Sequence, residues 1–186
     1  MLLILLVVCV AAYIGVTISN KKTKEKEEAS EEAAKIYLTD FDADDVSAFS
    51  YMLNGEKLSF HKDGDNWVYD ADTSVDLDED SVKSLLTQAG KMTASEKLDE
   101  ITDLSDYGLD APENVITIET SEDTVTLDVG NCNDMLSEYY IKKEGSDDVY
   151  LTDSTTAKLF TKTVDSLKAA EDTESTEDAE PSEDSE

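Results

Sequence analysis

The side chains that could do chemistry in this chain are mostly carboxylates. Its 186 residues include 45 acidic and 15 basic ones, a single histidine and two cysteines. Two carboxylates at a suitable separation can hydrolyse a glycosidic bond, but no motif selects one pair among so many. His61 has no second histidine to complete a metal site, and no glycine-rich phosphate loop occurs. The sequence therefore assigns no catalytic, cofactor-binding or metal-binding residue.

An acidic surface loop that binds calcium is one alternative. Asp63-Gly-Asp-Asn66 has the composition of a calcium-binding loop, but an EF-hand with Gly64 as its sixth residue would end at Asp70 instead of a glutamate. A hairpin turn explains the same residues more simply. The aspartates within residues 40–45 and 70–78 are dense enough to attract cations only loosely, because tight binding needs oxygens that converge on one point.

The overall charge limits the partners of the protein. A formal net charge of −30 disfavours nucleic-acid binding, which needs clustered lysine and arginine side chains. The same charge repels an anionic membrane surface. Cys9 lies in an apolar leader and Cys132 in the polar part of the chain, so we do not expect a disulfide. Cys132 also lacks a cationic neighbour that would activate its thiol.

The amino terminus predicts a membrane anchor. Its first 18 residues contain no charged side chain. As a helix they would be about 27 Å long, close to the thickness of the hydrocarbon core of a bilayer. No small-residue cleavage site follows, so we expect an uncleaved transmembrane anchor over residues 1–19. Residues 20–35 mix lysine and glutamate at helical spacing, which is typical of a solvated helical stalk.

The charges beside the anchor conflict with an outward-facing domain. Lys21, Lys22, Lys24 and Lys26 follow the apolar run directly, and the positive-inside rule would hold them in the cytoplasm. No charged residue precedes the run. A true start further upstream, with a basic leader, would explain both facts. The orientation in the membrane therefore stays open at this point.

Alternating apolar and polar residues predict a first antiparallel meander. Its strands are expected at residues 46–53, 56–62 and 67–69, and Asn54-Gly55 is a strong signal for a hairpin between the first two. A helix over residues 78–89 follows, capped by Asp78 and ended by Gly90.

A second meander follows in the same order. Its strands are expected at residues 115–120, 124–129, 139–142 and 149–151, with a loop over residues 130–136. The closing helix begins at Asp153 or Ser154, and its apolar stripe consists of Leu159, Phe160, Val164 and Leu167. Two antiparallel meanders, each followed by an amphipathic helix, predict an α+β domain over residues 36–168. The halves 36–103 and 104–168 could be a repeat, and residues 169–186 are expected to be a disordered acidic tail.

The stretch Leu104–Pro112 is expected to join the two halves. Gly108 can take a positive φ at no steric cost, and Pro112 favours an extended residue before it. Tyr107, Gly108, Leu109 and Pro112 are therefore expected to be structural, with Tyr107 packed between the halves. If Tyr140 and Tyr150 share an exposed face of the sheet, that face is the best candidate for a partner surface.

The sequence resembles the bacterial family called domain of unknown function 4340. The resemblance rests on Tyr107-Gly-Leu-Asp-Ala-Pro112, on Val125-Thr-Leu-Asp-Val-Gly130 and on the pairs Tyr139-Tyr140 and Val149-Tyr150. It implies an N-terminal membrane anchor and an extracytoplasmic domain, sometimes linked to ABC-type transporter components of the gliding-motility kind. It supplies no catalytic residues and no cofactor.

We therefore expect a single-pass membrane protein whose non-catalytic extracytoplasmic domain binds or assists another envelope protein, such as an ABC-type transporter complex. Two alternatives stay open. One is a cell-envelope hydrolase that uses paired carboxylates, and the other is a calcium-responsive surface domain.

Overall fold

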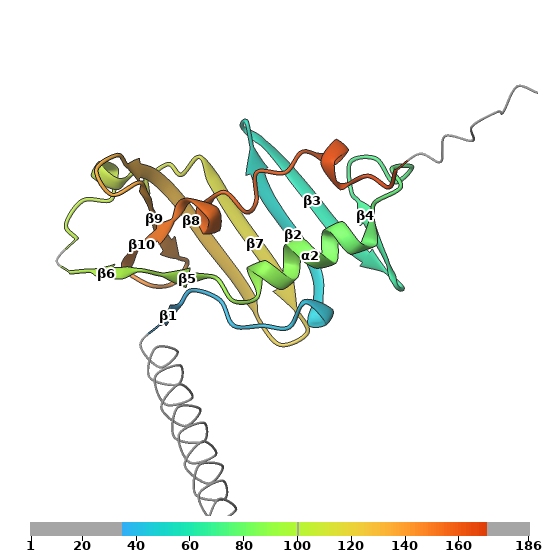
Figure 1. Ribbon diagram of the computed structural model, residues 1–186, viewed down its shortest axis with the longest axis horizontal. Helices are drawn as coiled ribbons and strands as arrows, with labels where there is room; N and C mark the ends of the chain where they lie inside the picture. The colour runs from blue at the N-terminus through green and yellow to red at the C-terminus, as the bar shows by residue number, and fades with distance from the viewer. Residues whose placement is uncertain (1–34, 100, 171–186) are drawn as a thin grey trace, which may run out of the picture.

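The computed structural model describes residues 35–99 and 101–170, which are built around one antiparallel sheet (Figure 1). Its strands are β2 (Val46–Leu53), β3 (Glu56–Asp63), β4 (Asn66–Tyr69), β6 (Glu96–Leu98), β7 (Asn114–Thr120), β8 (Thr124–Asn133), β9 (Glu138–Lys143) and β10 (Val149–Asp153). Their order across the sheet is β4-β3-β2-β7-β8-β9-β10-β6. A separate two-stranded ribbon pairs β1 (Ile36–Tyr37) with β5 (Thr93–Ala94).

The two expected meanders are joined edge to edge in this sheet. The first strand of each lies at the centre, where β2 pairs with β7 and Phe49 lies opposite Ile118. From this central pair β2-β3-β4 runs outward on one side and β7-β8-β9-β10 on the other. The prediction of antiparallel strands is confirmed. Whether the halves arose as a repeat stays a prediction.

The hairpins follow the local turn signals. Strand β2 spans the eight residues predicted from their aromatic and β-branched content, and Asn54 and Gly55 both have positive φ, at 53° and 81°. Such values are those of a type I′ turn, whose twist matches that of the strands it joins. The expected loop over residues 130–136 is wrong in part, because β8 continues to Asn133 through a bulge between Val129 and Cys132.

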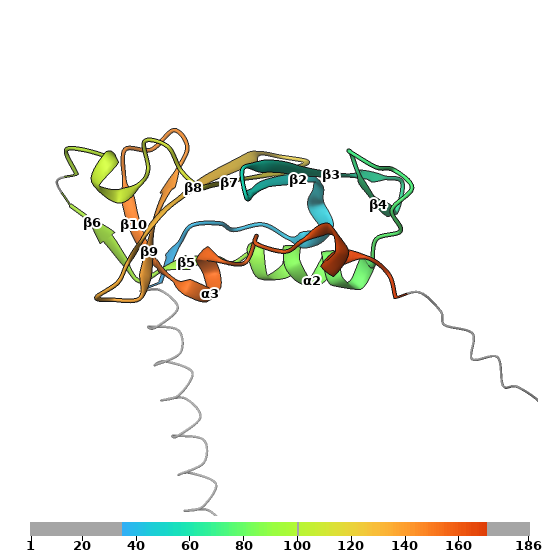
Figure 2. The same cartoon turned by 90° about the horizontal axis from the view of Figure 1, so that it is seen from above.

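One face of the sheet is covered by helix and coil, and the core lies between them (Figure 2). Helix α2 (Glu79–Ala89) is the predicted helix, and the Asp78 side chain accepts a hydrogen bond from the Ser81 amide at 2.5 Å. It buries Val82, Leu85, Leu86 and Ala89. On the sheet side the core contains stacked aromatic rings, with the centres of Phe49 and Phe60 4.7 Å apart.

The expected second long helix is wrong. Helix α3 (Ser154–Ala157) is a single turn, and after an irregular segment the chain forms a 3₁₀ turn, η3 (Val164–Leu167). The predicted stripe residues Phe160 and Leu167 are buried, but from non-helical backbone. The domain is therefore β-rich, with two α-helices among the described residues.

Some predictions fall on residues that the structure does not describe. The anchor over residues 1–19, nearly all of the stalk and the tail from residue 171 lie outside the described ranges. Within residues 35–99 and 101–170, no helix has both the length and the apolar character needed to cross a bilayer.

Candidate functional site

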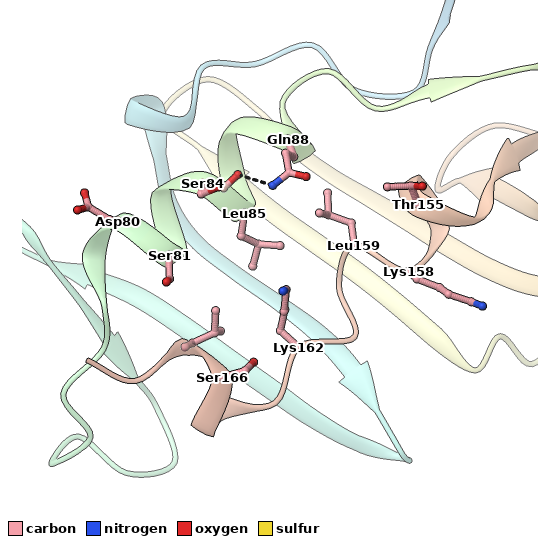
Figure 3. A pocket seen from close by; sticks show the side chains of 11 residues that line it. Asp80, Ser81, Ser84, Leu85, Gln88, Thr155, Lys158, Leu159, Lys162 and Ser166 are labelled. Atoms are coloured by element: carbon pink, nitrogen blue, oxygen red, sulfur yellow. Dashed lines mark hydrogen bonds between the residues drawn. The ribbon is translucent and has the colours of Figure 1, made fainter. Parts of the chain in front are cut away.

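A groove of about 590 Å³ lies between α2 and the segment that follows α3 (Figure 3). Its walls come from two parts of the chain that are distant in sequence. Helix α2 contributes hydroxyl groups, one carboxylate and Leu85, and the later segment contributes two lysines, Leu159 and Leu167. The lining residues are Asp80, Ser81, Ser84, Leu85, Gln88, Thr155, Lys158, Leu159, Lys162, Ser166 and Leu167.

Two polar side chains from the sheet hold the second wall in place. The Tyr51 hydroxyl donates a hydrogen bond to the Lys162 carbonyl at 2.7 Å, and the Asn114 amide donates to the Phe160 carbonyl at 3.0 Å. Both Tyr51 and Asn114 are buried. Burial, with a smaller contribution from Tyr69, raises the pKa of the Tyr51 phenol, so it remains a hydrogen-bond donor at neutral pH. The wall is thus fixed by the core.

The two lysines of the groove differ in their surroundings. The Lys158 amine lies 5.2 Å from the centre of the Tyr139 ring, and a hydrogen bond to Tyr139 is the main cause that raises its pKa. Figure 3 shows the Lys162 side chain extending toward α2, between Leu85 and Leu159. Among the described residues the Lys162 amine has neither a hydrogen-bond nor an ion-pair partner.

A second candidate feature is the tip of the β8–β9 hairpin. Met135 is 95% exposed and Leu136 is 54% exposed, which is unusual for adjacent large apolar side chains. The turn is nevertheless ordered by hydrogen bonds. The Asn133 carboxamide oxygen accepts from the amides of Met135 and Leu136 at 3.1 and 3.3 Å, and Ser137 takes a positive φ of 58°. The tip therefore presents its two apolar side chains in a defined place.

The expected linker motif supports this hairpin. The Asn133 amide donates to the Tyr140 hydroxyl at 2.9 Å, and the Tyr140 ring meets the Tyr107 ring edge to face at 4.7 Å. Tyr107 ends the short turn η2 (Ser105–Tyr107). The expectation that Tyr107 packs between the halves is therefore wrong, because its ring lies on β9 of the second half.

The rest of the motif packs against the bulge in β8. Gly108 has a φ of 68°, and a Cβ atom there would lie 2.4 Å from the Asn131 side-chain oxygen. A Cβ atom on Gly130 would lie 2.2 Å from the Tyr107 carbonyl oxygen. Leu109 is buried beside Gly130, and Pro112 is half-buried. The stretch packs on β8 instead of acting as a free connector, and its purely structural role stays a prediction.

Tyr140 and Tyr150 do not share a face. In the β9–β10 register Tyr140 lies opposite Leu151, and Tyr150 lies opposite the buried Ile141. Side chains directly opposite each other lie on the same face, and successive residues alternate, so the two tyrosines point to opposite sides of the sheet. Tyr150 packs partly against the main core. A single partner surface formed by both is thus wrong, whereas a contact through Tyr140 alone stays a prediction.

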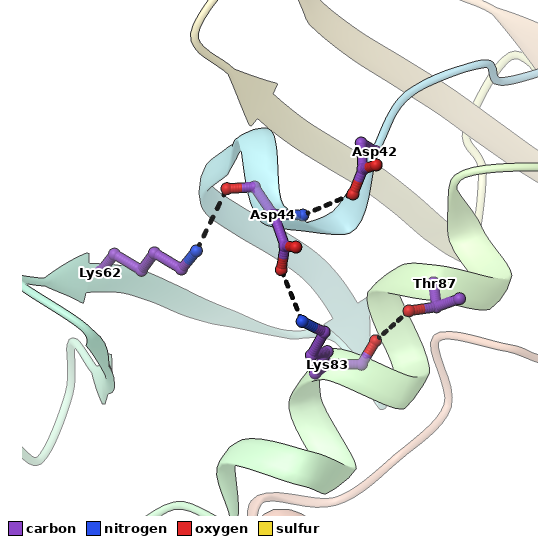
Figure 4. A network of polar contacts seen from close by, with 5 residues as sticks. All are labelled: Asp42, Asp44, Lys62, Lys83 and Thr87. Atoms are coloured by element: carbon purple, nitrogen blue, oxygen red, sulfur yellow. Dashed lines mark hydrogen bonds and ion pairs between the residues drawn. The ribbon is translucent and has the colours of Figure 1, made fainter.

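The aspartates near residue 42 are engaged with the protein itself (Figure 4). The Asp44 carboxylate binds the Lys83 amine at 2.7 Å, and Asp42 accepts from the Asp44 amide at 3.0 Å. The hydrogen bond to Lys83 lowers the pKa of Asp44, and the same contact raises that of Lys83. This contact ties the turn η1 (Ala43–Asp45) to α2. In the ranges 35–99 and 101–170, no group of three or more acidic, cysteine or histidine side chains is placed to hold a metal ion.

The His61–Asp70 pair is of chemical interest but was not predicted from the sequence. His61 Nδ1 and Asp70 Oδ1 are 2.6 Å apart on the open face of the sheet, with both side chains about half exposed, at 47% and 48%. The β3–β4 hairpin brings them together, because His61 lies opposite Val68 and Asp70 follows two residues later. The short turn at residues 63–66 was the only feature of the sequence that could have indicated this contact. Within the described part of the chain, no serine, threonine or cysteine hydroxyl or thiol hydrogen-bonds to His61.

Comparison with protein families gives a match that covers the Tyr107–Pro112 motif. The model of the family described as Domain of unknown function (DUF4340) matches residues 67–171, more than half of the 186-residue chain. The chain belongs to this family. The DUF4340 match contains the Tyr107–Pro112 motif, the hairpin tip and both walls of the groove, but begins after β2 and β3. No match was found among curated proteins or among solved structures.

Proposed function

We propose that this DUF4340 protein is a non-catalytic, membrane-anchored accessory module whose extracytoplasmic domain contacts an envelope protein through the β8–β9 tip. A component of an ABC-type transporter complex would fit this role. The observation that supports the proposal is the exposure of Met135 and Leu136 on an ordered turn. Such side chains favour a partner that buries them.

The energetics suit a specific but modest contact. Burying Met135 would contribute about 1.5–3 kcal/mol, and Leu136, which is 54% exposed, would contribute about half as much. Because Asn133 and the Tyr140–Tyr107 pair already order the turn, little conformational entropy is lost on binding.

The position of the tip supports a partner in or near the membrane. The described chain enters the domain at β1, where Ile36 pairs with Ala94. The carbonyl of the neighbouring Thr93 accepts a hydrogen bond from the Thr152 hydroxyl. Thr152 precedes Asp153, which pairs with Glu138 at the base of the tip. Entry and tip therefore lie near the same end of β10. An anchor over residues 1–19 would hold that end toward the bilayer.

The test is recovery of a partner from solubilised membranes with the tagged full-length chain. We expect a membrane-integral partner to be crosslinked and recovered with the native chain, and to be lost with the double variant Met135→Ser, Leu136→Ser. Asp134→Ser is the matched control, because it changes an exposed residue of the same turn without removing an apolar side chain. Unchanged recovery with the double variant, at unchanged thermal stability, would contradict the proposal.

The orientation has its own test. Cys132 is a free, exposed thiol in β8, three residues from the tip. If the domain is extracytoplasmic, a membrane-impermeant maleimide will label Cys132 in intact cells. Protection of Cys132 until lysis would instead favour the positive-inside orientation of the lysines after the anchor.

One specific observation favours the hydrolase alternative, although not through paired carboxylates. The His61–Asp70 pair has the geometry in which a carboxylate orients an imidazole for general-base chemistry. This alternative requires that Asp70→Asn abolish a cell-envelope function while leaving the melting temperature unchanged. A fully functional Asp70→Asn variant would exclude the pair.

A further inference from the structure

We propose that the groove between α2 and residues 158–167 binds a small amphiphilic carboxylate. Its apolar part would lie over Leu85, Leu159 and Leu167, and its carboxylate would meet the Lys162 ammonium group. This site is separate from the hairpin tip and does not depend on a partner there.

The charge in the groove is the first argument. Four lysines among the described residues form ion pairs with aspartates, as Lys83 does with Asp44. Lys162 has no such partner among the described residues, and it extends into the groove (Figure 3). In a chain with a net charge of −30, a cation left unneutralised inside a concave surface is a place where an anion can bind.

The apolar surface beside this cation is the second argument. Leu85 and Leu167 are buried at the base of the groove, and Leu159 is half-buried in its wall. The volume of about 590 Å³ lies within the range of pockets for small molecules, about 300–1,000 Å³. The three leucines give the groove one apolar side, and its other lining residues are polar or charged.

An unused hydroxyl group completes the polar side of the site. The Ser84 side chain is exposed on the α2 face that lines the groove, and its hydroxyl has no hydrogen-bond partner among the described residues. It can donate one hydrogen bond to a carboxylate oxygen. Asp80 lies at the start of α2 and points away from Lys162 in Figure 3. It disfavours a second negative charge at that end, so the ligand should be a monoanion.

The groove is formed before any ligand arrives. The hydrogen bonds from Tyr51 and Asn114 fix the carbonyls of Lys162 and Phe160, and α2 is fixed by its buried apolar face. A preorganised site loses less entropy on binding than one that must be assembled.

The test uses the full-length chain in nanodiscs and an octanoate probe that carries a diazirine for photo-crosslinking. Peptide mass spectrometry should place the crosslinks within residues 80–88 and 155–167. Unlabelled octanoate should compete with the probe, whereas octanol, which lacks the charge, and acetate, which lacks the apolar chain, should not. Crosslinks spread over the whole surface, or equal competition by octanol, would overturn the proposal.

Substitutions localise the effect. Lys162→Gln should lower probe affinity about tenfold, because it removes one charge-assisted hydrogen bond while leaving the main-chain contact to Tyr51. Lys83→Gln makes the same change on α2 outside the groove and should have no effect. Ser84→Trp, at an exposed helical position, should fill the groove and abolish labelling. Unchanged labelling of Lys162→Gln and Ser84→Trp, both folded, would overturn the proposal.

Discussion

Replacing Gly130 by alanine tests whether the Tyr107–Pro112 motif is part of the second meander. The added Cβ would lie 2.2 Å from the Tyr107 carbonyl oxygen and 3.0 Å from two atoms of Leu109. The first contact is with backbone, so it cannot be relieved by a change of rotamer. The motif must move away from the bulge in β8, and Leu109 must lose part of its burial.

The size of the effect follows from these contacts. Overpacking costs about 1–3 kcal/mol, and loss of the Tyr107–Tyr140 contact adds about 0.5–1.5 kcal/mol. A total near 3 kcal/mol corresponds to a fall in melting temperature of about 10 °C for a domain of this size. Thermal unfolding followed by far-UV circular dichroism will measure it.

The matched control is Gly145→Ala. Gly145 has a φ of 79° but no atom within 4 Å of its virtual Cβ, so alanine there adds only backbone strain of about 1 kcal/mol. Gly130 has no positive φ, so its substitution adds only the contact. If Gly130→Ala loses no more stability than Gly145→Ala, the motif does not lie against the bulge and the reasoning is refuted.

Three further predictions concern the same framework. Gly108→Val should lower the melting temperature, because valine is strained at a φ of 68° and its Cβ would collide with the Asn131 side chain; an unchanged melting temperature would contradict this. Tyr51→Phe should cost about 1–2 kcal/mol in chemical denaturation, because the Lys162 carbonyl loses its buried donor; a neutral variant would show that water replaces it. Asp78→Ala should destabilise the domain at neutral pH but not at acid pH. Hydrogen bonds from Ser81 lower the folded pKa of Asp78, so the stability it adds is present above its unfolded value of 3.8 and is lost as pH falls through the folded pKa; a difference between native and variant that persists at pH 2 would be inconsistent with this role.

The elements that the sequence predicts well are those fixed by neighbouring residues. The β2–β3 hairpin depends on Asn54-Gly55 and on the strand-forming residues on either side of it, and α2 depends on Asp78 and a regular apolar face. Both signals lie within about a dozen residues. The joining of the two meanders could not be predicted in this way, because the pairing of Phe49 with Ile118 is decided by a shared core.

The wrong prediction of the last helix has a specific cause. The carbonyls of Phe160 and Lys162, which a continuous helix would use for its own hydrogen bonds, accept from Asn114 and Tyr51 instead. Thr163 then caps a new turn by accepting from the Ser166 amide. The apolar stripe predicted correctly that Phe160 and Leu167 are buried, but it could not predict that their backbone is not helical. Both competing donors, Tyr51 and Asn114, lie far away in sequence.

The candidate sites were hidden for similar reasons. The groove is formed by α2 and a segment about 80 residues later, so no local pattern could place Ser84 beside Lys162. The adjacent Met135 and Leu136 were visible in the sequence as apolar residues in an expected loop. Their significance becomes clear only with their exposure and with the Asn133 hydrogen bonds that order them.

We expect the central pairing of β2 with β7 to limit how far this chain can be shortened without unfolding. The family match begins at Trp67, inside the edge strand β4. A fragment that starts there would leave β7 without β2 and β4 without β3, so the backbone hydrogen-bonding groups of two strands would be unpaired. It would also remove Phe49, Tyr51 and Phe60 from the core. Such exposed strand edges are templates for aggregation. The cooperative unit of this protein is therefore wider than the region that identifies its family, and truncation experiments should begin before β1.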